Sequence, residues 1–126
     1  IDLHSCGISQ YILNEYLKDE EKYEKHLQKI RDDYKQKADF FCEQLDKYLP
    51  EFKYQKPKGG MFLYGTFEEG IDTFALVEKC LKKKVVYVPG NQFYIDKVPN
   101  SEIRFNYTHS TFEQIEKGIK LIKSYL

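Results

Sequence analysis

Apolar residues recur at helical spacing through the first half of the chain. After the acidic residues 19–21, whose charge suits the positive end of a helix dipole, they follow one another at steps of three and four. The stripe consists of Tyr23, Leu27, Ile30, Tyr34, Ala38, Phe41, Leu45 and Tyr48. Because Pro50 cannot continue a helix, the pattern predicts one long helix that ends just before it. Such a helix can pack along a sheet or pair with a second helix in a coiled coil, and the pattern leaves both open.

Three shorter helices are predicted around the long one. The first covers residues 8–18, with Ser5 or Ser9 as its cap. The second covers residues 73–83, and the last begins after Thr111, a capping residue followed by acidic and amide side chains in the first turn. Each has apolar positions along one side of the helix.

Four segments have the composition of strands. They are residues 52–54, 61–67, 85–88 and 102–107, and turn residues separate them. Together with the helices they predict an α+β fold, in which a small, mostly antiparallel sheet has helices packed on one face. Segment 61–67 is apolar on both sides, so we expect its second face to be covered by something outside this chain.

The elements divide into two predicted regions. Residues 1–49 form a helical linker and the long helix, and residues 50–126 form the small α+β domain. The chain has 126 residues and lacks an initiator Met, so we expect it to begin inside a longer protein.

Charge and composition narrow the function classes. Twenty basic and 20 acidic residues give a net charge of zero, which argues against a nucleic-acid module. No apolar run is long enough to cross a membrane, and no signal peptide is visible. Cys6, Cys42 and Cys80 are widely spaced, so we expect reduced thiols and a cytoplasmic location. They lack metal-ligand spacing, and no metal site is expected.

The strand 102–107 carries the most informative residue. Its apolar residues alternate with Arg104 and Asn106, so one face is directed to a core and the other presents a guanidinium beside an amide. The planar fork of an arginine can hold a carboxylate with two parallel hydrogen bonds. A surface arginine in an internal ion pair is the alternative. No phosphate loop, nucleophile elbow or zinc-binding His-Glu-x-x-His motif is present, so the chain is not expected to contain a self-contained active site.

Three blocks resemble a known family. Residues 56–64 (KPKGGMFLY) are similar to its Pro-x-Gly-Gly-Met-Phe-Leu-Trp block, and residues 85–94 (VVYVPGNQFY) to its Val-x-x-x-Pro-Gly-x-x-Phe-Tyr segment. Residues 103–107 (IRFNY) are similar to its Ile-Arg-Leu-Asn-Phe strand. The family is the class I/II, fold-type I aminotransferases, which depend on pyridoxal phosphate. The blocks occur in the family's order and spacing, and the resemblance covers the carboxy-terminal small domain, in the branch that acts on 2-aminoadipate, kynurenine and aromatic amino acids.

The resemblance assigns roles to particular residues. Arg104 stands where the family holds the α-carboxylate of its amino-acid substrate, and Phe62 where an aromatic residue lines the pocket. Gly60 is expected to allow close backbone approach there, and Asn106 to support Arg104 in substrate binding. Lys84 replaces the family's usual Gly, so the turn there requires another conformation or a strained residue.

The resemblance also indicates what is missing. The family's cofactor-binding lysine lies in the large domain, before residue 1, so pyridoxal 5'-phosphate is expected in the intact enzyme and not on this fragment. The intact protein is expected to be a homodimer that transfers amino groups between amino acids and 2-oxo acids. Two other functions stay open: a ligand-sensing domain of a transcription regulator, and a structural module built on a coiled coil.

Overall fold

A computed structural model describes residues 6–68 and 70–126 of the chain. Its helices are α1 (Gly7–Leu17), α2 (Glu20–Tyr48), α3 (Thr73–Leu81) and α4 (Phe112–Lys123), with one 3-10 turn, η1 (Gly90–Phe93). Its strands are β1 (Phe52–Tyr54), β2 (Phe62–Phe67), β3 (Val88–Pro89) and β4 (Glu102–Asn106). No helix among the described residues is long and apolar enough to span a membrane.

By its internal contacts the chain divides within α2. One compact unit ends at Asp33, and the other comprises Tyr34–Leu126. In the first unit, α1 has no buried residue, and the ring of Tyr16 meets that of Tyr23 edge-on at 6.5 Å. Cys6 precedes α1 and makes no side-chain cap, while Ser9 lies inside the helix, so the predicted Ser9 cap is wrong; Ser5 lies outside the described residues.

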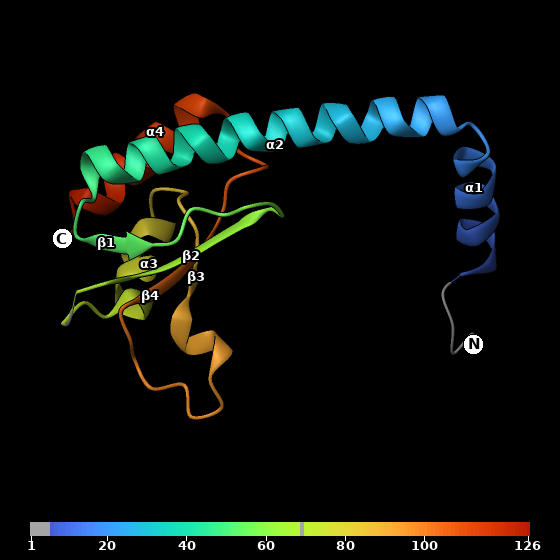
Figure 1. Cartoon of the computed structure of the whole chain (residues 1–126). Coiled ribbons are helices and arrows are strands. Elements are labelled where there is room, and N and C mark those ends of the chain that lie inside the picture. The colour runs from blue at the N-terminus through green and yellow to red at the C-terminus, as the bar shows by residue number, and fades with distance from the viewer. Residues whose placement is uncertain (1–5, 69) are drawn as a thin grey trace. The chain divides into compact units, whose positions relative to one another are not determined.

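The second unit contains a four-stranded antiparallel sheet with the order β1-β2-β4-β3. Figure 1 shows the carboxy-terminal half of α2 and α4 running side by side along the sheet. The ring of Phe40 on α2 meets that of Phe112 on α4 at 4.9 Å, and Tyr48 Oη donates a hydrogen bond to Glu116 at 3.2 Å. The predicted α+β class, with helices on one face of a small antiparallel sheet, is confirmed.

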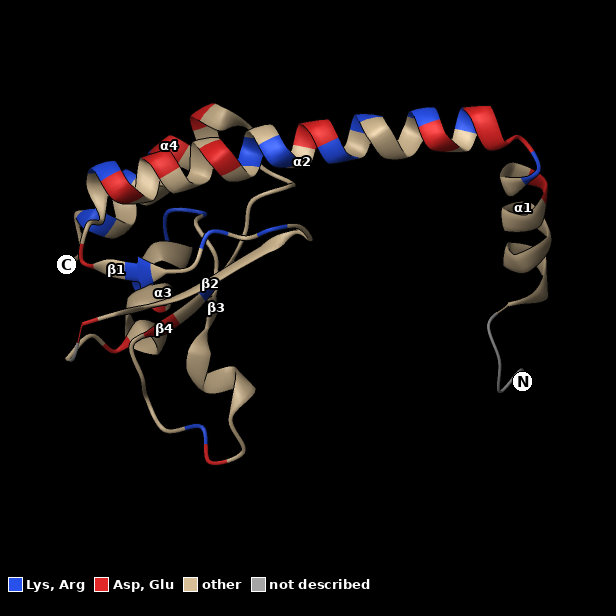
Figure 2. Ribbon diagram, viewed as in Figure 1, with Lys and Arg blue, Asp and Glu red and all other residues tan. Residues whose placement is uncertain are grey.

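The core lies between this sheet and its helices. Alternation along β2 and β4 directs Leu63, Phe67, Ile103 and Phe105 inward, where Phe105 meets Phe41 of α2 at 5.2 Å. The predicted stripe of the long helix supplies its share of that core in Ala38, Phe41 and Leu45. Charges of both signs alternate along the rest of α2 (Figure 2). Cys42 and Cys80 are also buried, and burial raises the pKa of both thiols, whereas Cys6 is exposed.

The strand predicted at residues 85–88 is wrong in its first three positions. Lys84 has a φ of +62°, and the backbone N–H of Val85 bonds the carbonyl of Cys80 at 3.1 Å. That bond closes the end of α3 in a motif that requires a left-handed residue at position 84. Pairing with β4 therefore starts only at Val88, and Val86 is 71% exposed. β-branched composition predicted a strand where the helix end determines the backbone.

Lys84 occupies a conformation that glycine adopts without strain. We expect Lys84→Gly to raise the free energy of unfolding by about 0.5–1 kcal/mol. The matched control is Lys82→Gly, because Lys82 has right-handed helical angles and should lose stability with the same change. Urea unfolding of the chain and its two variants measures both, and a Lys84→Gly variant no more stable than its parent contradicts the prediction.

Candidate functional site

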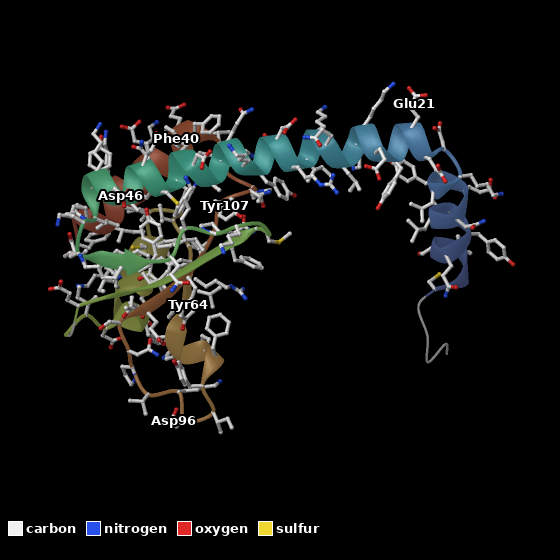
Figure 3. All side chains as sticks on the ribbon, in the orientation of Figure 1. Glu21, Phe40, Asp46, Tyr64, Asp96 and Tyr107 are labelled. Carbon is white, nitrogen blue, oxygen red and sulfur yellow. The ribbon has the colours of Figure 1, made fainter. Side chains whose placement is uncertain are left out.

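The sheet has an outward face that no helix of its own unit covers. On β2 the side chains of Phe62 and Tyr64 are 43% and 42% exposed. Strand pairing places Tyr64 opposite Arg104, and Val88 lies opposite Arg104 on the other side. Residues opposite each other in a sheet project from the same face, so Arg104 stands in the middle of this one. In Figure 3, Tyr107 lies on the α2 side of the strands and Tyr64 on the other side.

The guanidinium of Arg104 lies against two aromatic rings, and its Nε makes no hydrogen bond to a described residue. Its Cζ lies 4.2 Å from the ring centre of Phe62 and 4.9 Å from that of Phe93. Contacts of this kind are attractive, because a cation interacts favourably with the face of an aromatic ring. Arg104 Nε is buried and has no hydrogen-bond partner among the described residues, which also provide no ion pair for this side chain. A buried donor without an acceptor is unfavourable, and the rest of the guanidinium is left without an ion pair among these residues.

The internal ion pair considered for Arg104 is therefore absent from the described part of the chain. Its nearest acidic neighbour along the strand, Glu102, is bonded to other side chains. The guanidinium faces outward from a paired strand, whose hydrogen bonds fix the backbone beneath it. Such a group can orient a carboxylate with little movement of its own.

Gly60 lies at the turn before β2 and has a φ of +80°. No described atom comes within 4 Å of the position that a Cβ would take there, so the backbone conformation is what favours glycine. The buried Tyr107 hydroxyl donates a hydrogen bond to the Gly60 carbonyl at 2.8 Å. The turn is thus fixed to the core next to Phe62, and close approach of a ligand to Gly60 stays a prediction.

Asn106 is engaged in a turn after β4. Its Oδ1 accepts hydrogen bonds from the backbone N–H of Thr108 at 2.9 Å and of His109 at 3.2 Å. No hydrogen bond joins Asn106 to Arg104 within the described ranges. The structure thus gives Asn106 a role in shaping the turn, and its role in substrate binding stays a prediction.

Two residues of this face were not predicted from the sequence to belong to the site. Phe93 forms one of the two rings against Arg104, and Glu102 collects hydrogen bonds from Tyr64, Tyr94 and Asn100. The signal for Glu102 was its position two residues before Arg104, which places both on one face of the strand. The signal for Phe93 was only its place in the Pro-Gly-x-x-Phe segment.

These features match one protein family. The family model for aminotransferase class I and II covers residues 2–122. The chain therefore belongs to the class I and II aminotransferases. Members of this family use pyridoxal phosphate.

Individual relatives include two aminotransferases and a transcriptional regulator. Aromatic-amino-acid aminotransferase 1 of Thermococcus litoralis is 38% identical over 122 residues, which are 95% of this chain and 29% of that protein. The crystal structure of LysN, an alpha-aminoadipate aminotransferase from Thermus thermophilus complexed with N-(5'-phosphopyridoxyl)-L-leucine, matches with a TM-score of 0.85 and 28% identity over 98% of this chain and 31% of that one. The HTH-type transcriptional regulator NorG of Staphylococcus aureus is 30% identical over 100% of this chain and 28% of that protein. The chain thus spans less than a third of the length of the relatives it matches.

Proposed function

We propose that this chain supplies the carboxylate-binding wall of a pyridoxal-phosphate-dependent aminotransferase. Arg104 binds the α-carboxylate of the amino acid, with Phe62 beside it as a wall of the substrate pocket. The observation that carries the proposal is the guanidinium of Arg104, which lies against Phe62 and Phe93 on an outward face that no helix of its unit covers and has no ion pair among the described residues. A bound carboxylate would pair with the outward nitrogens of the guanidinium fork.

Binding at Arg104 contributes by orientation. The rings of Phe62 and Phe93 lie close to the guanidinium, so a carboxylate on it has a defined direction. A substrate fixed at one end presents its Cα–H bond in a fixed direction, and such positioning can lower a barrier by several kcal/mol. Pyridoxal phosphate, when bound in the whole enzyme, supplies the electron sink for transferring an amino group to a 2-oxo acid.

The residues of this chain account for binding of the amino-acid substrate and do not account for binding of the cofactor. We infer that the cofactor's lysine belongs to a large domain of the whole protein, as the family resemblance implies. α1 supports this inference, because its apolar side chains are exposed and an apolar surface of this kind favours a partner. They are Ile8, Tyr11, Ile12, Leu13 and Leu17. We further propose that residues 1–49 link the small domain, residues 50–126, to the large one. The whole protein is proposed to be a cytoplasmic homodimer.

The two other functions receive less support. A coiled coil needs a free apolar stripe, yet Ala38, Phe41 and Leu45 of α2 are buried in the chain's own core. A ligand-sensing regulator would use the same face of the sheet, and a winged-helix region in the whole protein would identify one. The Gly-Gly-Met-Phe-Leu block at residues 59–63 favours the enzyme.

The isolated chain tests where the reactive machinery lies. Mixed with pyridoxal phosphate, an amino acid and a 2-oxo acid, the 126 residues are expected to form no product above a protein-free control. Borohydride reduction should leave no cofactor adduct confined to one lysine, because an exposed lysine reacts without selectivity. The whole enzyme should catalyse the reaction and carry a single labelled lysine. Turnover by the isolated chain, or one labelled lysine in it, contradicts the proposal.

A further inference from the structure

We infer that Glu102 is a positioning residue for Arg104, acting through the aromatic rings on which the guanidinium lies. The inference rests on the proposed function, since it names a second residue that sets how Arg104 holds a carboxylate. Glu102 and Arg104 are two residues apart on β4 and so project from the same face of the sheet.

The Glu102 carboxylate connects three separate segments. Its Oε2 accepts a hydrogen bond from Tyr64 Oη at 3.0 Å, which joins it to β2. Its Oε1 accepts one from Tyr94 Oη at 3.2 Å, just after η1. Asn100 Nδ2 also donates to Oε2 at 3.0 Å, from the loop before β4. Hydrogen bonds to an ionised acceptor are stronger than those between neutral groups, so this carboxylate is well placed to hold all three segments.

The backbone beneath Glu102 is fixed as well. The hydroxyl of the fully buried Thr73 lies 2.8 Å from the carbonyl oxygen of Asn100 and 2.9 Å from that of Glu102. Gly90 packs so closely that a Cβ there would lie 2.3 Å from Glu102 Cβ. Glu102 therefore has little room to shift toward η1, and the segments it binds are attached to a strand that is paired on both sides.

The two tyrosines that donate to Glu102 lie next to Phe93, one in sequence and one in space. Phe93 is the last residue of η1 and directly precedes Tyr94, so it lies between the close contact at Gly90 and the side-chain hydrogen bond from Tyr94 to Glu102. The ring of Tyr64 also meets that of Phe93 edge-on at 5.9 Å. Phe93 in turn lies 4.9 Å from Arg104 Cζ. Without Glu102, both tyrosines lose their acceptor, and Phe93 is free to leave the guanidinium.

Both phenols are held as donors. Burial, reinforced by the hydrogen bond to Glu102, raises the pKa of Tyr64 above its usual value. The hydrogen bond to Glu102 raises the pKa of Tyr94. The two phenols therefore keep their protons throughout the neutral range.

Steady-state kinetics of the whole enzyme test the inference. Glu102→Ala is expected to raise KM for the amino acid about tenfold while kcat changes less than about threefold, because carboxylate binding loosens and the reacting groups stay in place. Tyr64→Phe combined with Tyr94→Phe should reproduce this effect with a smaller change in the fold. Glu102→Gln keeps one acceptor oxygen and should fall between Glu102→Ala and the parent.

Tyr48→Phe is the matched control. It removes a comparable phenol–carboxylate hydrogen bond, to Glu116, on the helical side of the sheet. It should leave KM within about twofold of the parent, which separates the Glu102 network from general loss of a tyrosine hydroxyl. A KM increase of the same size in Tyr48→Phe overturns the inference.

A double-mutant cycle shows whether Glu102 acts through Arg104. In an Arg104→Ala background, Glu102→Ala should cause little further loss of kcat/KM, because the group that it positions is gone. A full tenfold loss in both backgrounds overturns the inference while leaving the role of Arg104 intact. If Arg104→Ala alone has no effect, the proposed function fails first, so the two failures are distinguishable.

Discussion

Arg104→Ala in the whole enzyme is expected to lower kcat/KM for the amino acid by about 100-fold, which corresponds to about 2.7 kcal/mol of lost transition-state stabilisation. The loss follows from the geometry at β4, where the guanidinium faces outward and its buried Nε has no partner among the described residues. Alanine removes both hydrogen bonds to the carboxylate and the cation that attracts it. KM should rise and kcat/KM fall together, as expected for an interaction that both binds and orients the substrate.

Two further variants separate geometry from charge. Arg104→Lys keeps the positive charge but loses the planar fork, and should recover only part of the activity, leaving about a tenfold deficit. Lys53→Ala is the control, since Lys53 is an exposed cation on β1 of the same sheet. It should retain activity within about twofold. Steady-state kinetics of Arg104→Ala indistinguishable from those of the parent would rule out the assignment.

Gly65→Ala is expected to destabilise the fold by about 2–3 kcal/mol. Gly65 lies inward in the middle of β2, and a Cβ there would lie 2.5 Å from the carbonyl oxygen of Lys53 and 2.7 Å from the ring of Phe52. The ring cannot retreat easily, because it meets those of Phe67 at 4.9 Å and Phe105 at 5.6 Å. The added methyl group must therefore separate β1 from β2 or displace this aromatic cluster.

Gly118→Ala is the matched control for this change. Gly118 lies within α4, and the nearest atoms to its added Cβ belong to Val85, at 3.8 and 3.9 Å, which is ordinary contact. Alanine stabilises a helix interior more than glycine does, so the free energy of unfolding of this variant should rise by up to about 1 kcal/mol. Urea unfolding of both variants beside the parent chain gives the comparison. Equal free energies of unfolding for Gly65→Ala and the parent would contradict the prediction, because they would show that β1 and β2 accommodate the added methyl group without loss of stability.

Local sequence signals were sufficient for most of the fold. The three-and-four spacing of Tyr34, Phe41 and Leu45 determines which side of α2 packs on the sheet. Thr111 caps α4 as predicted, through a reciprocal pair of hydrogen bonds with Gln114. The failure at residues 85–87 arose because a left-handed Lys84 and the closure of α3 determine that backbone, and β-branched composition does not encode either.

The candidate site was predictable only in part. Alternation placed Arg104 on the outward face, because that depends on its own strand. Glu102 and Phe93 could not be assigned in the same way, since their roles depend on pairs brought together by folding. Tyr64 and Glu102 are 38 residues apart in the chain. Neither residue alone indicates that the other will be its partner.

The most direct measurement compares an amino acid with the amine that lacks its carboxylate. Both can deliver an amino group to the cofactor of the whole enzyme, but only the amino acid can use Arg104. In Arg104→Ala, the first half-reaction measured by stopped flow should slow about 100-fold with the amino acid and stay within about threefold with the amine. Equal losses with the two donors would contradict the proposal that Arg104 binds the substrate carboxylate.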